Sequence, residues 1–216
     1  MSFNIIGDIA GQFKTLQALL AKMPEGTPIS VGDMIDRGPQ SKEVLEFFRE
    51  GERFAIKGNH EDLFIDFVKN QGRYYQGCWL DNGGEATAKQ FQDSVGFCDI
   101  PVDLIEWVEN LPESMVITTP SDNGLWETCI ISHAPLHYDE SLSLQLPLDY
   151  GILWNRDETS VKPKQRQFQL FGHNSHWDGR VFMAGVVPYA QCLDTGQKML
   201  IGMHWPSMVL YEQEFI

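Results

Sequence analysis

The chain has 216 residues, of which 43% are hydrophobic and 21% are charged, and its formal net charge is -14 at pH 7. This balance is typical of a folded soluble protein, and the acidic charge argues against nucleic-acid binding through a basic surface. The length corresponds to about one domain. We therefore expect residues 1–216 to form a single domain, with a helical, cap-like insertion over roughly residues 72–120.

The cysteines and the start of the chain indicate a reducing compartment. Four cysteines lie far apart with no CxxC pair, at Cys78, Cys98, Cys129 and Cys192. We expect buried, reduced thiols there rather than a disulfide framework or a structural zinc site. Met1 runs almost directly into the first predicted strand, which leaves no basic and apolar leader, and no apolar run approaches membrane-spanning length. We therefore predict a cytoplasmic protein with no membrane partner.

The first third of the chain alternates short apolar runs with apolar residues at helical spacing. We predict strands over residues 3–6, 29–31 and 54–56. We predict helices around residues 13–23, 44–48 and 63–68. This alternation implies parallel strands that are joined by right-handed crossovers.

The rest of the chain has a different character. From about residue 72 to about residue 120 the sequence looks helical, with "GRYYQGCWLDNGGEATAKQF" leading into "PVDLIEWVENLP". Strands then dominate, over residues 115–118, 128–131 and 168–171 and in several stretches between 181 and 211. An α/β half followed by a strand-rich half predicts an α/β fold in which two sheets pack face to face with helices outside.

Polar residues directly follow five of the predicted strands, and in four cases a glycine comes immediately before. These residues are Asp8, Asp33, Asn59 with His60, His133, and His173. In open α/β sheets ligands bind beyond the carboxyl ends of strands, so the five positions point to one shared pocket. One such residue is usually structural, but five together favour a binding site. The donors are oxygen and nitrogen without thiolate, which suits Mn²⁺, Fe²⁺ or Zn²⁺ better than Mg²⁺ or Ca²⁺.

A family resemblance rests on five motifs. "GDIAG", "GDMIDRGP", "GNHE", "SHAP" and "FGH" occur in that order between Asp8 and His173, and "LDTG" near Asp194 extends the likeness. Together they resemble the calcineurin-like metallophosphoesterases, and more narrowly the phosphoprotein phosphatases in their compact bacterial and bacteriophage-lambda form. The resemblance implies an α/β/β/α sandwich of two mixed sheets flanked by helices. It also implies a phosphoesterase in which metal-activated hydroxide attacks phosphorus in line.

The resemblance assigns two divalent metal ions to the strand-end residues. It implies that Asp8 and Asp33 hold the first ion, and that Asp33 bridges to the second. Asn59, His133 and His173 would complete the second site. Two metals about 3.5–4 Å apart that share a ligand are the arrangement used for attack on phosphorus. We expect Mn²⁺, with Fe²⁺ and Zn²⁺ as alternatives, and a first site that is weak or empty.

The same resemblance assigns four residues to the chemistry. His60 matches the general acid that protonates the leaving oxygen, and Asp36 matches the carboxylate that orients this imidazole. A nearby anion would keep the proton on the ring near neutral pH. Arg37 and Arg156, the latter in "LWNRD", match the arginines that grip the phosphate. We also expect Glu61 to start the third helix and to brace the pocket.

The chain departs from the family pattern at Ala10. The family's first motif is Asp-x-His-Gly, and alanine replaces its metal-binding histidine. Gln12 is a candidate replacement through its amide oxygen, although we favour an ordinary polar role at a helix start because carbonyl ligands bind transition metals weakly. Three outcomes remain: an active enzyme with a weakened first metal, a pseudophosphatase that only binds ligands, or an engineered inactive form. The other catalytic positions are filled, so we favour the active enzyme.

The substrate prediction rests on two further stretches. "WLDNGGEAT" (residues 79–87) and "LWNR" (residues 153–156) resemble the lambda-type phosphatases. They favour a serine/threonine protein phosphatase, also with activity on tyrosine, that takes a phosphorylated protein, peptide or small phosphoester. The alternative is a hydrolase of symmetrical dinucleoside polyphosphates such as diadenosine tetraphosphate. The preference is modest because substrate choice depends on loops.

Overall fold

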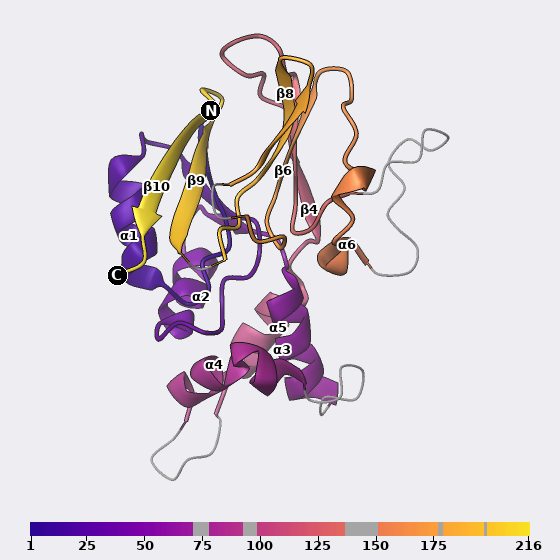
Figure 1. The fold of residues 1–216 in the computed structure, drawn as a ribbon. Coiled ribbons are helices and arrows are strands. Elements are labelled where there is room, and N and C mark those ends of the chain that lie inside the picture. Colours follow the sequence, from indigo (N-terminus) through magenta and orange to yellow (C-terminus); the bar gives the residue numbers. More distant parts are fainter. Residues whose placement is uncertain (71–77, 93–98, 137–150, 177–178, 197) are drawn as a thin grey trace.

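The computed structural model describes residues 1–70, 78–92, 99–136, 151–176, 179–196 and 198–216. Within these residues two five-stranded sheets lie face to face, and helices lie around them (Figure 1). Both sheets contain parallel and antiparallel neighbours. The predicted α/β sandwich of two mixed sheets flanked by helices is therefore confirmed.

The first sheet contains the three strands predicted from the start of the chain. Across the sheet its strands are β10 (Val209–Glu214), β9 (Met199–Trp205), β1 (Phe3–Ile6), β2 (Thr27–Ser30) and β3 (Phe54–Ala55). β1, β2 and β3 are parallel, whereas β9 runs antiparallel to β1. The carboxyl ends of the three parallel strands therefore meet at one edge of the sheet.

The second sheet is built from the later part of the chain. Across the sheet its strands are β4 (Ser114–Ile117), β5 (Thr128–Ser132), β6 (Gln167–Phe171), β8 (Val187–Cys192) and β7 (Val181–Ala184). β5, β6 and β8 are parallel, while β4 and β7 close the edges as antiparallel strands. Three more carboxyl ends are thereby brought to one edge.

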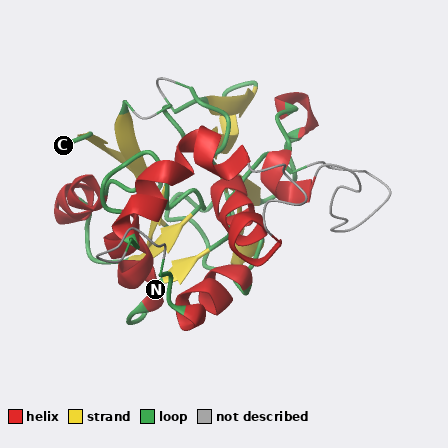
Figure 2. Cartoon of the chain, turned by 90° about the horizontal axis from the view of Figure 1, so that it is seen from below, coloured by secondary structure: helices red, strands yellow, loops and turns green. Residues whose placement is uncertain are grey.

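The helices cover the first sheet and one end of the sandwich. They are α1 (Phe13–Lys22), α2 (Ser41–Arg49), α3 (Asn59–Asn70), α4 (Glu85–Gln90), α5 (Val102–Glu109), α6 (Gly151–Trp154) and the short turns η1 (Leu80–Gly84) and η2 (Glu158–Ser160). α1 packs against β9 and β10, and α3, α4 and α5 gather below the sheets (Figure 1). Seen from below, helices lie in front of the strands (Figure 2). Within the predicted helical stretch the structure has η1, α4 and α5, and β4 begins inside its predicted end, at Ser114.

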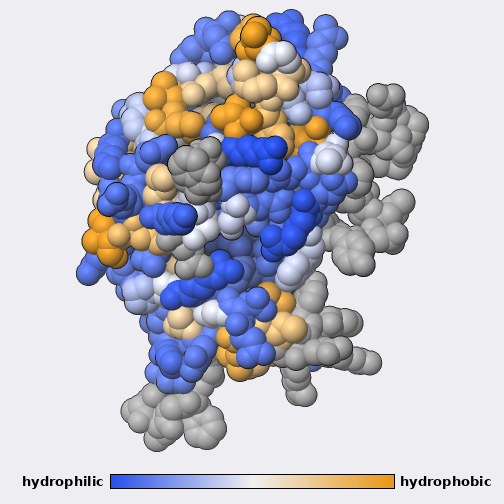
Figure 3. Space-filling model, in the orientation of Figure 1, coloured by the Kyte–Doolittle hydropathy of each residue, from blue (hydrophilic) through white to orange (hydrophobic). Residues whose placement is uncertain are grey.

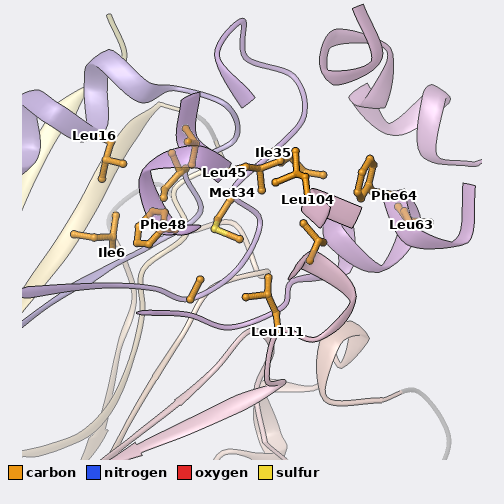
Figure 4. Packing of buried hydrophobic residues seen from close by; sticks show 14 of the residues in the cluster. Ile6, Leu16, Met34, Ile35, Leu45, Phe48, Leu63, Phe64, Leu104 and Leu111 are labelled. Carbon is orange, nitrogen blue, oxygen red and sulfur yellow. The ribbon is translucent and has the colours of Figure 1, made fainter. Parts of the chain in front are cut away.

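Two buried clusters hold these layers together. Along β1, alternate side chains point to opposite faces of the sheet, so Ile5 enters the cluster between the sheets and Ile6 enters the cluster under the helices. Leu45 and Phe48 of α2 are among the side chains of the helix-side cluster (Figure 4). A fully buried leucine or phenylalanine contributes about 1.5–3 kcal/mol. This packing holds the strand ends in fixed positions.

The surface and the cysteines complete the description. Polar residues cover most of the face shown in Figure 3, with hydrophobic side chains in smaller groups between them. Cys129 and Cys192 are buried free thiols, but Cys78 is exposed, so the prediction of a buried thiol is wrong at that position. Cys98 lies outside the described residues. None of the described helices is long and apolar enough to cross a membrane.

Candidate metal centre

The structure brings together the five predicted donor residues from five different strand ends. Asp8 follows β1, Asp33 follows β2, and Asn59 begins α3 shortly after β3. His133 follows β5 and His173 follows β6 in the facing sheet. All four glycines that precede polar residues allow loops to touch directly: an added side-chain carbon at Gly7, Gly32, Gly58 or Gly172 would fall less than 3.0 Å from another loop. The pocket thus forms where two sheets meet.

Four donor atoms converge at distances that suit one cation. Oδ1 of Asn59 lies 2.9 Å from Nε2 of His133 and 2.9 Å from Nδ1 of His173. Nε2 of His133 lies 3.3 Å from Oδ1 of Asp33. Ligands about 2.1 Å from a metal and about 90–110° apart are separated by about 3.0–3.4 Å. The observed separations fit donors placed around a shared ion.

The hydrogen bonding of His133 supports the same conclusion. Its Nδ1 lies 3.0 Å from the carbonyl oxygen of Val31, which can only accept, so Nδ1 carries the hydrogen. When Nε2 carries no hydrogen, it presents a lone pair to two oxygens, those of Asn59 and Asp33. Lone pairs facing each other repel unless a cation lies between them. This donor set therefore fits a divalent metal.

Asp8 supplies a further oxygen next to this group. Asp8, Asp33 and His133 each offer a donor atom within 4.8 Å of the others. Oδ2 of Asp8 accepts a hydrogen bond from the backbone N–H of His173 at 3.2 Å. Its Oδ1 is buried with no hydrogen-bond partner among the described residues. An added side-chain carbon at Gly172 would lie 1.9 Å from this oxygen, so only glycine fits there.

The electrostatics of the carboxylates show why a cation would be favourable. Burial raises the pKa of Asp8 well above its usual range, and the neighbouring carboxylates of Asp194 and Asp33 raise it further. Burial also opposes ionisation of Asp33, but His133 and His60 outweigh it and lower its pKa. A positive charge between Asp8 and Asp33 would relieve their repulsion. The pocket is thus poised for bound cations.

Ala10 lies in the first loop, where the family pattern has its histidine. It is 3% exposed, and its backbone has a positive φ of 49°. Its backbone N–H donates to the carbonyl of Asp33, which ties the first loop to the second strand end. Gln12 precedes α1 and its side chain does not cap the helix. A ligand role for Gln12 stays a prediction.

His60 and Asp36 form a buried pair beside the donor atoms. Nδ1 of His60 lies 2.6 Å from Oδ2 of Asp36, and its Nε2 lies 3.7 Å from Oδ2 of Asp33. Burial alone would lower the pKa of His60, but the charge of Asp33 and the hydrogen bond and charge of Asp36 together raise it to about 9. A pKa of about 9 favours the protonated ring at neutral pH, and its Nε2 is turned toward Asp33 of the donor cluster.

Two exposed arginines place positive charge near this centre. The positive charge of Arg37 acts to lower the pKa of both Asp8 and His60, against the larger effects that raise them. Burial lowers the pKa of His173 to about 3, with His133 and Arg156 acting in the same direction. Such electrostatic effects require proximity, so both arginines lie near the donor cluster. His173 itself stays neutral and able to bind a metal.

Glu61 has a larger structural role than its helix position suggested. The residue is fully buried in the first turn of α3. Its carboxylate accepts hydrogen bonds from the backbone N–H groups of Asp33 at 2.9 Å, Met34 at 2.8 Å and Gly58 at 2.8 Å. It therefore ties together the two loops that carry Asp33 and Asn59. The "GNHE" motif was the only sequence signal for it.

Asp194 is a neighbour that our sequence analysis did not place in the site. It follows β8, whose carboxyl end lies beside that of β6. Its two oxygens accept hydrogen bonds from Ser175 Oγ at 2.7 Å and from the N–H of Gly196 at 2.7 Å. Its negative charge reaches Asp8. The "LDTG" motif marked this position without indicating its role.

The backbone of the site is unusually constrained. Seven described residues other than glycine have a positive φ, and five of these belong to the loops of the site. The five are Ala10, Asp33, Asp36, Arg37 and His173. Such conformations persist only where the surroundings enforce them, and they concentrate at functional sites. The conformations of these loops are therefore those expected of a functional site.

Comparisons with known proteins agree with this geometry. A family model described as calcineurin-like phosphoesterase matches residues 1–192. Over 185 residues the chain is 29% identical to serine/threonine-protein phosphatase 2 of Escherichia coli (strain K12), covering 78% of each protein. Over 157 residues it is 28% identical to an asymmetrical bis(5'-nucleosyl)-tetraphosphatase of Anoxybacillus flavithermus, covering 64% of this chain and 59% of that protein.

A solved structure extends the comparison to the fold. A protein serine/threonine phosphatase from Saccharomyces cerevisiae matches with a TM-score of 0.60 at 16% identity, covering 100% of this chain and 80% of that one. At this identity the likeness shows the shared fold alone. The family model, by contrast, spans most of the sequence and includes the five strand-end donors from Asp8 to His173. The chain therefore belongs to the calcineurin-like phosphoesterase family of metal-dependent hydrolases, which act on phosphoric ester bonds.

Proposed function

We propose that the protein is a Mn²⁺-dependent phosphomonoesterase that acts on phosphoserine and phosphothreonine in proteins, with phosphotyrosine as a further substrate. The observation that carries the proposal is the convergence of Asp33, Asn59, His133 and His173 at 2.9–3.3 Å beside a protonated His60. A metal cluster next to a proton donor is what hydrolysis of a phosphate ester requires. The similarity to a bacterial serine/threonine phosphatase over most of both chains supports the substrate class.

The donor residues would hold two cations. Asp8 and Asp33 would hold the first, and Asp33, Asn59, His133 and His173 the second. Mixed oxygen and nitrogen donors without thiolate favour Mn²⁺, with Fe²⁺ and Zn²⁺ as alternatives. When bound, the ions supply an activated water and neutralise the charge of the phosphate.

The other residues of the site act on the substrate. Arg37 and Arg156 bind the phosphate oxygens, for which the planar guanidinium is well suited. His60 transfers the proton on Nε2 to the leaving oxygen as its bond to phosphorus breaks. Asp36 keeps the imidazole oriented by accepting a hydrogen bond from Nδ1 at 2.6 Å. The leaving group thus departs as a neutral alcohol.

The function can be tested with a matrix of metals and substrates on the purified protein. We expect turnover of an aryl phosphate and of phosphoserine and phosphothreonine peptides with Mn²⁺, loss of turnover after EDTA treatment, and recovery on adding Mn²⁺ back. Metal content and Mn²⁺ binding are measured in parallel. A protein that binds Mn²⁺ but turns over no phosphate ester at any metal concentration would contradict the proposal.

A dinucleoside tetraphosphate hydrolase is the second candidate. The similarity to an asymmetrical bis(5'-nucleosyl)-tetraphosphatase favours its inclusion, although that match covers less of both chains. The same matrix therefore includes diadenosine tetraphosphate. A kcat/KM for this compound above that for phosphopeptides would replace our substrate assignment. Analysis of the products would show whether cleavage is symmetrical, as expected for the symmetrical dinucleoside polyphosphate hydrolase that the sequence offers as the alternative.

Ala10→His is expected to strengthen the first metal position. The change adds an imidazole donor beside Asp8, and histidine tolerates the positive φ at this residue. The Mn²⁺ concentration for half-maximal activity should fall by about tenfold or more, because even residues that only orient the ligands change metal affinity by about 10–100-fold. Calorimetric titration of Mn²⁺ provides a readout that does not depend on turnover.

Ala10→Asn is the matched control for this substitution. Asparagine also tolerates a positive φ but brings only an amide oxygen, which is a weak ligand for transition metals. We expect it to change Mn²⁺ affinity much less than histidine does. If Ala10→His altered neither the affinity nor the rate, the first metal would not depend on this position.

A further inference from the structure

The carboxylate of Asp36 is surrounded by donors from a segment far along the chain. Its oxygens lie 3.1 and 2.9 Å from Nε1 of Trp79, and Oδ1 accepts from Oγ1 of Thr87 at 2.7 Å. Trp79 and Thr87 are 43 and 51 residues away in sequence. Both belong to the helical stretch around η1 and α4 that sits below the sheets (Figure 1). Asp36, Trp79 and Thr87 are at most 1% exposed.

These contacts fix the direction of the hydrogen bond to His60. An indole N–H can only donate, so Asp36 accepts from Trp79. The Thr87 hydroxyl accepts from the Asp36 N–H at 2.9 Å, and its own hydrogen faces the carboxylate at 2.7 Å and Oγ of Ser41 at 2.9 Å. Held by these groups, the carboxylate meets Nδ1 of His60 as an acceptor. The hydrogen therefore resides on Nδ1. Nε2 is left to deliver the proton.

Packing makes this arrangement rigid. The indole of Trp79 packs edge-on against Phe64, with ring centroids 5.4 Å apart, and in a tilted arrangement against Phe67, with centroids 4.9 Å apart. Both phenylalanines lie on α3, the helix that begins with Asn59 and His60. The indole can therefore shift only together with α3. A fixed Trp79 holds Asp36 at the distance that His60 requires.

The same segment also positions Arg37. The backbone N–H of Arg37 donates to the carbonyl of Gly83 at 3.0 Å. Gly83 has a φ of 104°, and an added side-chain carbon would lie 2.6 Å from Cγ of Arg37. Only glycine permits this close approach. The stretch from Trp79 to Thr87 thus contacts both the acid-orienting carboxylate and a phosphate-binding arginine.

We propose that Trp79 and Thr87 are positioning residues for proton donation: by holding Asp36 they set the tautomer and orientation of His60. The proposal rests on the proposed function, in which the proton passes from Nε2 of His60 to the leaving oxygen while Nδ1–H stays bound to Asp36. After transfer the imidazole is neutral and the leaving group is an alcohol. The segment 79–87 is thereby a working part of the active site rather than only a packed helical insertion.

The dependence of rate on the leaving group tests the proposal. Departure of 2,4-dinitrophenolate needs little protonation, whereas departure of phenolate depends on it. With saturating Mn²⁺, Trp79→Phe and Thr87→Val should lower kcat for phenyl phosphate about tenfold more than for 2,4-dinitrophenyl phosphate, a part of the 10²–10⁴-fold typical of general acid catalysis. Thr87→Ser retains the hydroxyl and should restore the wild-type ratio of the two rates.

Trp205→Phe is the matched control for Trp79→Phe. Trp205 is also fully buried and its Nε1 donates a hydrogen bond at 2.8 Å, but to the carbonyl of Thr119 in the cluster between the sheets. The Trp205→Phe variant should lose about as much stability as Trp79→Phe. Its ratio of the rates for phenyl phosphate and 2,4-dinitrophenyl phosphate should stay at the wild-type value. Thermal unfolding of each variant confirms folding. If Trp79→Phe does not fold, the nearly isosteric pair Thr87→Val and Thr87→Ser decides.

The outcomes separate this proposal from the function on which it rests. His60→Asn serves as the reference for complete loss of the acid. If His60→Asn changes the rate ratio but Trp79→Phe and Thr87→Val lower both rates equally, these two residues only pack and the positioning proposal is wrong. If His60→Asn leaves the ratio unchanged, or the wild type turns over neither compound, the proposed function fails and this proposal fails with it.

Discussion

Replacing Glu61 with alanine is expected to lower the free energy of unfolding by about 3 kcal/mol or more. The carboxylate accepts three backbone N–H groups, from Asp33, Met34 and Gly58, at 2.8–2.9 Å. Alanine would leave these donors without an acceptor, and each buried unsatisfied donor costs about 1–3 kcal/mol. Denaturant unfolding of the metal-free protein, followed by circular dichroism, measures the loss.

The position of Glu61 in its helix provides a matched control. Glu61 is the third residue of α3, and Glu43 is the third residue of α2. Both carboxylates favour the helix N-terminus, a contribution of about 0.3–1 kcal/mol, but only Glu61 is fully buried and bonded to the loops. We expect Glu43→Ala to cost only that amount. Equal losses for the two variants would show that the three loop hydrogen bonds contribute nothing.

The loss of Glu61 should also reach the metal centre. The bonded loops carry Asp33 and Asn59, so their release would widen the separations among the donor atoms. Glu61→Gln keeps one acceptor oxygen but turns an NH₂ group toward backbone donors, and we expect its stability to lie between those of the wild type and Glu61→Ala. Mn²⁺ affinity should fall in the same order, which calorimetry can measure.

Replacing His60 with asparagine is expected to lower kcat on phenyl phosphate by about 10²–10⁴-fold. The imidazole lies 2.6 Å from Asp36 and is the protonated group beside the donor cluster. Asparagine keeps a polar side chain of moderate size but cannot deliver the proton. Single-turnover measurements with saturating Mn²⁺ separate the chemical step from product release. Activity within about threefold of the wild type would exclude His60 as the proton donor.

The pH profile gives an independent check on the same residue. Burial opposes protonation of His60, yet Asp33 and Asp36 outweigh it and raise its pKa to about 9. The active form is the protonated one, so activity should hold below this value and fall as the pH rises through it. A cation beside Asp33 would cancel the charge that raises the pKa of His60. The alkaline limb of the pH profile of the Mn²⁺-loaded enzyme should therefore lie below about pH 9. Asp36→Asn should move it lower still.

His204→Asn serves as the control for the substitution at His60. His204 is half-buried in β9, and its Nδ1 lies 2.7 Å from Oγ of Ser207, outside the metal centre. Removing it takes away a histidine and one hydrogen bond without touching Asp33 or Asp36. We expect normal kcat and an unchanged alkaline limb. A shared loss in both variants would point to general destabilisation.

Much of the fold could be predicted because its signals are local. The short apolar run at residues 3–6 and the helical spacing along residues 13–23 each lie within a few residues, and the structure has β1 and α1 there. The strand-end polar residues could also be found, because a carboxylate, amide or histidine marks each turn and a glycine precedes it in four of the five. The sequence did not reveal that Cys78 is exposed, because the burial of a side chain on a helix depends on what packs against that helix.

The sequence by itself determined the layers of the sandwich and the chemical types gathered at the strand ends, since periodicity and turn motifs are written in neighbouring residues. Only the tertiary structure decided that Glu61 ties two loops together across 27 and 28 residues and that Thr87 reaches Asp36 across 51. Such partners are chosen by which loops the packed sheets and helices bring into contact. No local pattern encodes that choice, because the contact exists only once the chain has closed.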